Sequence, residues 1–455
     1  MPSVPDERVD TTPSLAVEAA YRSVESGEFD AACELAATAM SSDTATVTYE
    51  AGRAVASAAA LRGGYRSTDF ELHSALMKRT IRLEPSHQHA RYHLIRVAIR
   101  AQDWPTAFRA ARAPELAVAV ARDHVGWDGI LVGLRDGPSC ADAWFVASWY
   151  LHAQGQLVRA HQAKVEYARA ILAGPPHQLR RARALAFLER YDEAVSAALA
   201  GARVRSSRDE AMWLVADIGL ADPSSSVVNG GNSIAPLGGR LDRWYRRRSV
   251  VVVGPTAPDN PDWSEIAEHE VIVAPKLTVE RAEQLRDAGA RTIITYLTGV
   301  SEAMLAEKYA TSLDVFDAIV VRPNDDLRHS GLRSREGVTR SSGEPRHLLD
   351  ASSFAIPRIA YDVLRSSPAQ LSIRHADLFV TGRYDEGYRQ ELNMAERTGI
   401  VLNLDGYGHD LVADHQLLAS LKRKGLIDVD DRLAETLRLA PIDYLTKVQA
   451  NRSGA

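Results

Sequence analysis

The sequence lacks the features that mark several large classes of protein. Only two cysteines, Cys33 and Cys140, occur in 455 residues, so we expect neither a disulfide scaffold nor a cysteine-based zinc site. No apolar run reaches the length of about 18 residues that a membrane-spanning helix needs, and the first residues contain no apolar stretch typical of a secretion signal. We therefore expect a cytoplasmic protein without a membrane span.

A strong excess of charge of one sign is also missing. Lysine and arginine number 54 against 59 acidic residues, which gives a net charge of -5, so a nucleic-acid partner is not expected. Hydrophobic residues make up 45% and charged residues 25%, the balance of an ordinary folded protein. A chain of this length is too long for one core, and roughly two or three domains are expected.

The two common glycine-rich phosphate-binding motifs are absent as well. The apolar run Val250–Val253 is followed by Gly254-Pro255-Thr256, and neither Gly-x-Gly-x-x-Gly nor Gly-Lys-Ser/Thr is found there. Dinucleotide and P-loop chemistry are therefore not expected. A turn at the end of such a strand can still receive a nucleotide, and the alternative is a purely structural turn.

The first half of the chain contains a recurring helical signature. A turn residue is followed by an aromatic or large apolar residue, with alanine three positions later, at Phe29/Ala32, Trp104/Ala107, Leu157/Ala160 and Tyr191/Ala194. The last two alanines are 34 positions apart, the length of a tetratricopeptide repeat. The small alanine allows the second helix of a pair to approach the first closely. The pattern predicts a tetratricopeptide-like helical-repeat domain over residues 14–220, preceded by a disordered segment 1–13.

Repeat domains of this kind bind a partner protein or a chain-like substrate on their concave face, so a protein partner is one expectation for the first half. After it, residues 222–240 are rich in serine, glycine and proline, which predicts a linker over 221–248.

The pattern then changes to short apolar runs that alternate with helical stretches, which predicts a Rossmann-like parallel sheet domain over 249–455. The strands are expected at Val250–Val253, Val271–Val273, Thr292–Tyr296, Ala318–Val321 and Leu378–Val380. Helices are expected at Val279–Ala288, Glu302–Ala310 and Ala355–Leu364. Ligands of such sheets bind outside the carboxyl ends of the strands, where Gly254, Gly299, Arg322 and Gly382 are expected to lie.

His409 is the strongest candidate for a catalytic residue. Tyr407-Gly408 is typical of a turn, and Asp410 can cap a helix with leucines at helical spacing. The helix N-terminus favours a neutral imidazole, which can accept a proton from an attacking hydroxyl. Asp414 could order the nearby backbone or the base itself. The alternative interpretation is a structural histidine at a helix start.

The segment around His409 resembles the last characteristic motif of the sialyltransferases. In that motif a histidine is followed, after four intervening residues, by an acid and then by a basic helix, a glycine and a short strand. Here these features are His409, Asp414 and the run Leu421-Lys-Arg-Lys-Gly425-Leu-Ile-Asp-Val429. Asp414 stands where the family usually has glutamate. The upstream run Leu378-Phe-Val-Thr-Gly-Arg-Tyr384 is similar to the strand and loop that precede this motif in bacterial members.

Two further segments resemble the other motifs of that family. The run Ser249–Thr256 is similar to the donor-binding motif, although the family has Gly-Asn-Ser where this chain has Gly254-Pro255-Thr256, and an arginine or asparagine pair near Ala274-Pro275-Lys276. The run Ser352-Ser353-Phe354-Ala355-Ile356 resembles the Ser/Thr-Gly turn and helix of the second motif, without its glycine.

The resemblance implies a metal-independent glycosyltransferase that needs no cofactor. Its donor would be a nucleotide sugar, such as one linked through cytidine monophosphate, and its acceptor a glycan, a lipid-linked molecule or a protein. His409 would be the general base, with Asp414 in support. The implied donor contacts are Gly254, Pro255, Thr256, Arg322, Ser352, Ser353 and Gly382.

Other observations leave alternatives open. Residues 328–347 combine five arginines with glycines, which predicts a mobile loop that closes over phosphate groups or is merely solvated. Asp428-Val429-Asp430 is interpreted as a surface turn and not as a metal site. The departures from the donor motif also allow a second class of function, a scaffold or regulatory protein whose α/β domain has lost its activity.

Overall fold

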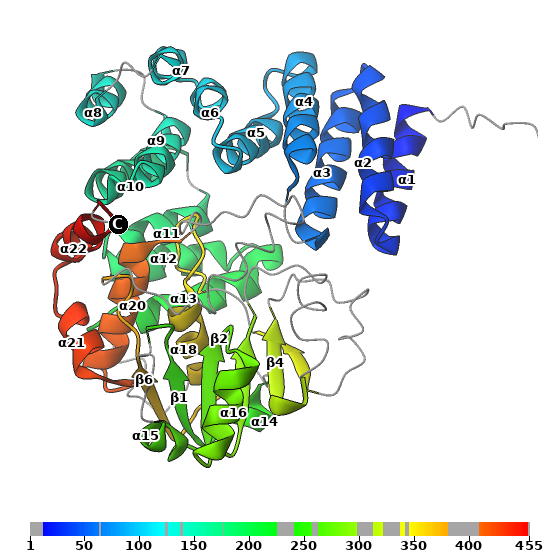
Figure 1. Ribbon diagram of the computed structural model, residues 1–455. Helices are drawn as coiled ribbons and strands as arrows, with labels where there is room; N and C mark the ends of the chain where they lie inside the picture. Colours follow the sequence, from blue (N-terminus) through cyan, green and yellow to red (C-terminus); the bar gives the residue numbers. More distant parts are fainter. Residues whose placement is uncertain are drawn as a thin grey trace, which may run out of the picture.

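The computed structural model describes residues 12–62, 65–122, 126–136, 140–175, 177–224, 241–256, 263–297, 313–321, 337–341, 345–380 and 409–453. An arch of helices built from the first half of the chain stands over an α/β domain built from the second half (Figure 1). The fold class predicted from the sequence, a helical-repeat part followed by a Rossmann-like part, is confirmed.

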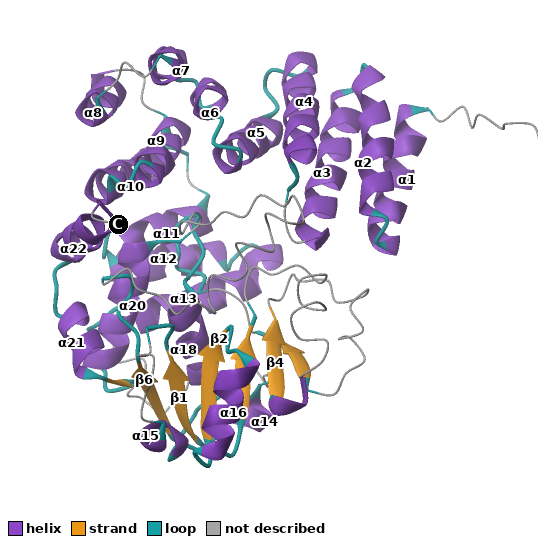
Figure 2. Ribbon diagram, in the orientation of Figure 1, coloured by secondary structure: helices purple, strands orange, loops and turns teal. Residues whose placement is uncertain are grey.

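The described residues before position 249 form helices and no strand (Figure 2). The helices are α1 Pro13–Ser26, α2 Phe29–Thr38, α3 Ala45–Arg62, α4 Ser67–Leu83, α5 Gln88–Arg100, α6 Trp104–Ala110, α7 Pro114–Ala121, α8 Trp127–Asp136, α9 Ala141–Ala153, α10 Leu157–Ala173, α11 Gln178–Phe187, α12 Tyr191–Gly201 and α13 Arg208–Ala221. Consecutive helices pack as antiparallel pairs, as in α1/α2, α3/α4, α9/α10 and α11/α12.

Each of the four sequence signatures begins the second helix of a pair. Phe29, Trp104, Leu157 and Tyr191 are the first residues of α2, α6, α10 and α12. The anchor alanines are buried, with exposed fractions of 0% for Ala32, Ala107 and Ala194 and 6% for Ala160. The turn before each helix contains a residue of positive φ, at Gly27, Gln102, Gly155 and Glu189. The signature is therefore a helix-pair turn, as predicted.

The second half contains a seven-stranded sheet in which all neighbouring strands are parallel. The strands are β1 Ser249–Val253, β2 Val271–Pro275, β3 Ile293–Tyr296, β4 Ala318–Val321, β5 Val338–Arg340, β6 Gln370–Arg374 and β7 Asp428–Val429. Their order is β5-β4-β3-β2-β1-β6-β7. β1 lies between β2 and β6, with Val251 opposite both Ile272 and Ser372.

Helices cover both faces of this sheet, as the apolar strands predict. Alternate residues of β1, such as Val250 and Val252, pack against α14 Asp242–Tyr245, α18 Ala355–Arg365 and α20 Leu411–Arg423. The intervening Val251 and Val253 pack against α15 Ser264–Ala267 and α16 Val279–Asp287. The chain ends in α21 Asp431–Leu437 and α22 Pro441–Ser453. No helix of the described residues is long and apolar enough to cross a bilayer.

The strand predicted at Leu378–Val380 is wrong. The sixth strand is Gln370–Arg374, which pairs with β1 along its whole length, and residues 378–380 form a turn. Leu378 and Phe379 have φ of 49° and 72°, outside the β region. Their apolar character has another cause, because Leu378 is buried beside α22, where the Tyr444 hydroxyl donates to its carbonyl at 2.8 Å.

Two other predictions need correction. Residues 328–347, expected to be a mobile loop, include strand β5 and the buried His347; residues 328–336 and 342–344 lie outside the described part. The run 428–430, interpreted as a surface turn, forms edge strand β7 and the N-cap of α21, where the Asp430 side chain accepts from the amide of Leu433 at 2.8 Å.

The helical part and the α/β part share an extensive interface. Helix α13 packs on α20, and α10 packs on α22. The Ser420 hydroxyl donates to the carbonyl of Leu220 at 2.8 Å, and Lys164 Nζ lies 2.6 Å from Asp410 Oδ2. In Figure 1 the strand arrows point toward the helical arch. The carboxyl ends of the strands therefore face the repeats.

Candidate functional site

The candidate site lies at the carboxyl edge of the sheet, between β1 and β6. From β1 the chain proceeds through β2 to β5 on one side, then returns to β6 and β7 on the other side. Such a reversal of strand order opens a crevice beyond the strand ends, where α/β proteins bind ligands. The segments after β1, after β6 and before α18 and α20 all reach this edge.

The turn after β1 is tied to the turn after β6. The Thr256 hydroxyl donates to the carbonyl of His375 at 2.6 Å, and the Thr256 amide donates to the same oxygen at 3.1 Å. A Cβ added to Gly254 would lie 2.2 Å from that oxygen and 2.8 Å from Ala376 Cα. Gly254 is therefore required because two backbones approach closely. The Thr256 side chain, predicted to contact a donor, is used to hold this junction together.

A small hollow, partly open to solvent, lies beside this turn. Its lining comes from the ends of β1 and β2 and from the first turn of α16, and includes Gly254, Pro255, Trp263, Lys276 and Arg281. Thr278 caps α16, accepting from the amide of Arg281 at 3.3 Å. Two cations beside a helix N-terminus favour an anion such as phosphate.

The second predicted contact segment, Ser352-Ser353, is held by Asp414. The buried Asp414 carboxylate accepts from the Ser353 hydroxyl at 2.5 Å and from the Phe354 amide at 2.7 Å. The bond to Phe354 also satisfies an amide near the start of α18. Asp414 and Ser353 thus fix the backbone of this segment, and the Ser353 hydroxyl is used internally.

His409 is held by the segment that Asp414 fixes. Its Nδ1 lies 3.4 Å from the carbonyl oxygen of Ser352, its ring stacks on Phe354 with centroids 4.2 Å apart, and its backbone forms a parallel bridge with Ser352. Because a carbonyl can only accept, this contact assigns the proton to Nδ1 and leaves Nε2 as the basic nitrogen. The stacked Phe354 in turn lies 4.3 Å from the ring of Phe379, beyond β6.

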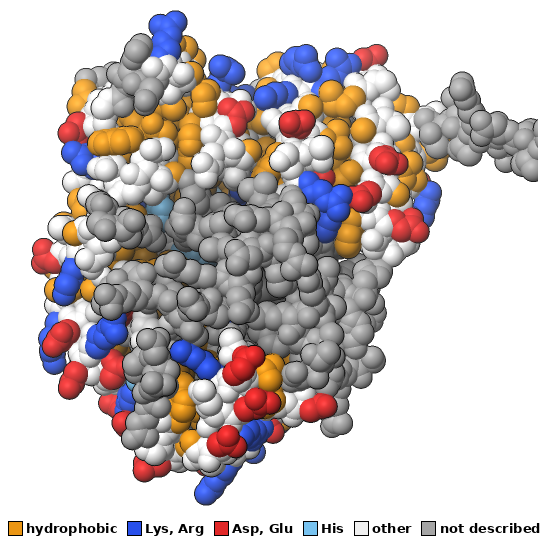
Figure 3. Space-filling view, viewed as in Figure 1, with side chains coloured by type: hydrophobic (Ala, Val, Ile, Leu, Met, Phe, Trp, Pro, Cys, Tyr) orange, Lys and Arg blue, Asp and Glu red, His pale blue; other side chains and the backbone are white. Residues whose placement is uncertain are grey.

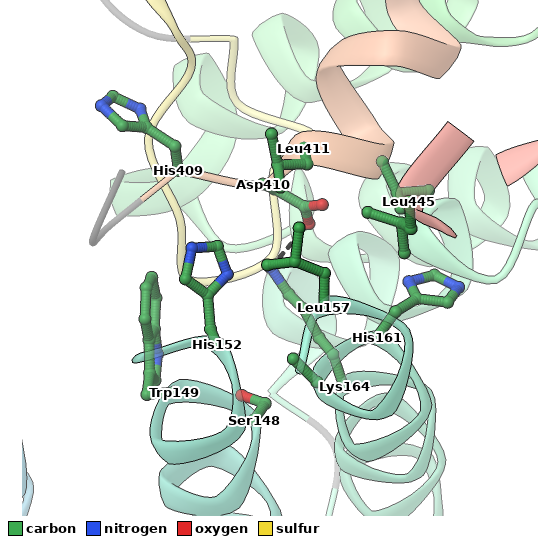
Figure 4. A pocket seen from close by; sticks show the side chains of 12 residues that line it. Ser148, Trp149, His152, Leu157, His161, Lys164, His409, Asp410, Leu411 and Leu445 are labelled. Carbon is green, nitrogen blue, oxygen red and sulfur yellow. Dashed lines mark hydrogen bonds and ion pairs between the residues drawn. The ribbon is translucent and has the colours of Figure 1, made fainter. Parts of the chain in front are cut away.

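Below His409, a buried ion pair joins the repeats to the start of α20. Asp410 caps α20 by accepting from the amide of Ala413 at 3.0 Å, while Lys164 of α10 lies 2.6 Å from its other oxygen. Burial would raise the pKa of Asp410, but the Lys164 ammonium and the capped amide outweigh it and lower the pKa. Figure 4 shows Lys164 reaching Asp410 while the imidazole of His409 points away from this pair.

Two histidines, the buried His347 and the half-buried His161, lie near the same ion pair. Burial lowers the pKa of His347 to about 4, with Asp410 acting in the opposite direction. Partial burial also lowers the pKa of His161, which lines a second hollow together with Lys164 and Asp410. Both histidines are therefore neutral at pH 7, so the ammonium of Lys164 is the cation that balances Asp410.

Backbone strain is concentrated along this edge. Non-glycine residues with positive φ include Lys276 after β2, Asp350 before α18, and three residues after β6, which are His375, Leu378 and Phe379. Such conformations cost of order 1–3 kcal/mol each and cluster at functional sites. The concentration supports a functional crevice at the carboxyl edge.

The structure brings together most of the residues that the sequence singled out, but in two groups. Gly254, Pro255 and Thr256 line or support the hollow beside α16, and Ser352, Ser353, His409 and Asp414 form the group before α18 and α20. The turn after β6 contacts both groups through His375 and Phe379. Arg322 and Gly382 lie outside the described residues.

Sequence reasoning missed the residues that line the hollow from the second strand. Lys276 and Arg281 follow β2 within one turn of α16, and His375 follows β6 directly. The position of these residues immediately after apolar strands was the available signal. In the described part of the chain, no group of three or more histidine, cysteine, aspartate or glutamate side chains has an arrangement that could hold a metal ion.

The comparisons with known proteins are sparse. No protein-family model matches the chain, and no curated protein matches its sequence. Among solved structures, a mutant of O-GlcNAc transferase from Thermobaculum terrenum aligns with 97% of this chain and 91% of its own, at 12% identity and a TM-score of 0.22. A likeness this slight supports no conclusion about activity.

Proposed function

We propose that this protein is a glycosyltransferase that moves a sugar from a nucleotide-activated donor to an acceptor hydroxyl. The observation that carries the proposal is the pairing, at one sheet edge, of a cation-lined hollow with an oriented histidine. The hollow would take the nucleotide, with its phosphate near Lys276 and Arg281 and its base along the wall that includes Trp263. The sialyltransferase-like motif around His409 favours a cytidine monophosphate sugar.

The proposed reaction is a single inverting displacement. Nε2 of His409 takes the proton of the acceptor hydroxyl while the oxygen forms a bond to the anomeric carbon. The bond between that carbon and the phosphate oxygen breaks, and the nucleotide leaves as an anion beside Lys276 and Arg281. Asp414 has a positioning role, because it fixes the Ser352–Phe354 backbone that orients His409. The step as proposed uses no metal and no cofactor.

One observation favours a second candidate, a non-catalytic scaffold or regulatory protein. The hydroxyls of Thr256 and Ser353, two of the expected donor contacts, donate to His375 and Asp414 within the protein. Hydroxyls that are hydrogen-bonded within the protein in this way are not offered to a donor. In this second candidate the repeats bind a protein partner, and the α/β domain only supports them.

A thermal-shift screen with nucleotides separates the two candidates. A mononucleotide at about 100 times its dissociation constant should add roughly 2.7 kcal/mol of stability, with cytidine monophosphate the most effective. The shift should disappear when Lys276→Gln and Arg281→Gln are combined, and persist in Arg291→Gln, whose side chain is exposed elsewhere on the domain. Release of nucleotide from the sugar donor would then establish turnover. A chain that no nucleotide or nucleotide sugar stabilises is the scaffold.

A further inference from the structure

A stripe of cationic and aromatic side chains runs along one face of α5. Tyr92, Arg96 and Arg100 follow one another at intervals of four residues, and His93 lies beside them, so they share a helix face. The opposite face, including Leu94 and Ile95, is buried among the repeats. The two arginine side chains remain exposed, so this face of α5 is available to a ligand.

Tyrosines are the recorded partners of these two arginines. Nη1 of Arg96 donates to the Tyr92 hydroxyl at 2.6 Å, and the Arg100 guanidinium lies 5.7 Å from the centre of the Tyr65 ring. Within the described ranges, no carboxylate forms an ion pair with either guanidinium. Although the Arg100 side chain reaches solvent, partial desolvation by the surrounding chain lowers its pKa and the Arg96 cation lowers it further, while Tyr65 acts in the opposite direction. The two like charges thus stand side by side, and neither has a direct carboxylate partner among the described residues.

Further members of the stripe come from α3 and α11. Arg53 of α3 pairs with Glu50 at 3.3 Å, and the ring of His93 lies 5.7 Å from that of Tyr49. Arg180 of α11 lies 3.8 Å from Asp350 and donates to the Tyr167 hydroxyl at 2.7 Å. We call these residues the arginine stripe; its members are Arg53, His93, Arg96, Arg100 and Arg180. The two acids at its ends, Glu50 and Asp350, are each paired with a member, and the surplus charge lies on Arg96 and Arg100.

One end of the stripe reaches the candidate catalytic group. Arg180 of the stripe lies 3.8 Å from Asp350, and the Tyr167 hydroxyl donates to the same carboxylate, so this end of the stripe meets the segment before α18. Asp350 is two residues from Ser352, whose carbonyl oxygen faces His409. On the face of the molecule drawn in Figure 3, the described Lys/Arg and Asp/Glu side chains are interspersed. The stripe therefore ends, at Arg180, beside the segment that orients the proposed base.

We propose that the arginine stripe binds the acceptor, and that this acceptor is a saccharide chain bearing carboxylate or phosphate groups. This inference rests on the proposed function, because only if His409 is the general base must the acceptor hydroxyl lie at the end of the stripe near His409. Guanidinium forks pair with the oxygens of carboxylate and phosphate, and the half-buried Tyr49 and Tyr92 can offer a ring face to a sugar. A saccharide supplies the anionic group, the ring face and the hydroxyl in one molecule.

Binding of defined saccharides to the full chain, without donor, tests this assignment. The probes are an oligogalacturonate, a phosphorylated mannan oligosaccharide, the methyl ester of the oligogalacturonate as an uncharged match, and poly-glutamate. At least one acidic saccharide should bind, more weakly as salt rises, and the ester should not. Combining Arg96→Gln with Arg100→Gln should weaken binding by about tenfold or more, since each charged hydrogen bond contributes about 1.5–3 kcal/mol.

A matched control is the pair Arg109→Gln and Arg135→Gln, which removes the same charge from exposed positions on α6 and α8 and should change affinity by less than about twofold. If the double variant with Arg96→Gln and Arg100→Gln does not fold, the double variant with Arg96→Lys and Arg100→Lys is used instead. It keeps both positive charges but lacks the two-pronged guanidinium groups. It should cost about threefold or more in affinity.

Equal losses in the stripe and control variants would overturn the proposal, as would equal binding of the ester. Poly-glutamate that binds as tightly as the acidic saccharides would assign the surface to an acidic peptide instead. The measurement needs neither donor nor turnover. If the chain binds an acidic saccharide but shows no transferase activity, the proposed function fails and the saccharide-binding proposal stands. If it shows transferase activity but binds no acidic saccharide, the reverse holds.

Discussion

The helical repeats and the carboxyl edge of the sheet both contain residues whose backbone has a positive φ, but for different reasons. In the repeats these residues end a helix and start the next, as Gln102 and Glu189 do, and each is followed by a buried alanine at a fixed distance. At the carboxyl edge, His375 and Phe379 have the same backbone conformation without any such regularity. The comparison suggests that strain which recurs with the repeat serves packing, whereas strain gathered at one edge serves a site.

The largest expected difference between the two regions is catalytic. His409 precedes α20 and His87 precedes α5, where it caps the helix by accepting from the amide of Ala90 at 3.1 Å. If His409 is the general base, His409→Ala should lower turnover by about 10²–10⁴-fold and leave nucleotide affinity nearly intact. His87→Ala should lower stability slightly and leave turnover unchanged. Steady-state kinetics of both variants decide, and an equal turnover in the two would remove His409 from the mechanism.

The next difference is a dependence of stability on pH. His347 is buried and its pKa is lowered to about 4 by that burial, whereas in the unfolded chain it titrates near 6.5. As the pH falls from about 6.5 toward 4, the unfolded state binds a proton that the folded state does not, so the free energy of unfolding should fall by about 3 kcal/mol. His347→Phe should remove this loss. In the repeats, His73, whose pKa burial lowers to about 3, should extend the same loss to lower pH.

Urea unfolding of the parent, His347→Phe and His73→Phe at several pH values measures these contributions. Identical slopes of stability against pH in the parent and the His347→Phe variant would contradict the assignment of His347 as a neutral buried group.

A third test compares two aspartates that hold helix starts. Asp414 is buried and accepts from the Ser353 hydroxyl and the Phe354 amide, whereas Asp103 is half-buried and caps α6 through the amide of Thr106 at 3.1 Å. Asp414→Ala removes the acceptor of two buried donors and should lower stability by about 2–3 kcal/mol. Asp103→Ala should cost about 1 kcal/mol. Chemical denaturation measures the free energy of unfolding of both variants. A smaller loss for Asp414→Ala than for Asp103→Ala would mean that water satisfies the donors that Asp414 otherwise binds.

The smallest effects should have opposite signs. Gly254→Ala places a Cβ against the backbone of His375 and Ala376 and should destabilise the protein by about 1–3 kcal/mol. Gly133, inside α8, has room for a methyl group, since the nearest atom, Leu116 Cδ2, would be 3.5 Å away. Gly133→Ala should therefore stabilise the chain by up to about 1 kcal/mol. Thermal melts of the two variants are sufficient, and destabilisation by Gly133→Ala would show that α8 requires its glycine.

The sequence predicted those parts of the structure that depend on short-range patterns. The four helix-pair turns, the strands from β1 to β4 and α18 follow from spacing and apolarity within a few residues. The prediction failed at Leu378–Val380, because apolar side chains buried by a distant helix resemble a strand. β5 was missed within a run of arginine and glycine.

The candidate site was predicted in part, through the resemblance around His409. The position of His409 beside Ser352 depends on the hydrogen bond between Ser353 and Asp414, which are 61 positions apart. The hydrogen bond between Thr256 and His375 joins residues 119 positions apart. Such long-range contacts leave no periodicity in a single sequence. For the same reason, Lys276 and Arg281 could be recognised only when β2 and α16 had been placed beside β1.

The ion pair between Lys164 and Asp410 has a consequence for how far the chain can be divided. Asp410 is 5% exposed, and its partner comes from the other half of the molecule, 246 positions away. A fragment limited to residues 249–455 would leave this carboxylate without its cation and would uncover the surfaces of α20 and α22 that meet α13 and α10. The domain boundary seen in the sequence therefore does not divide the chain into two parts that are each stable alone. Any exchange of the repeats for those of another protein would have to supply a lysine at the same point.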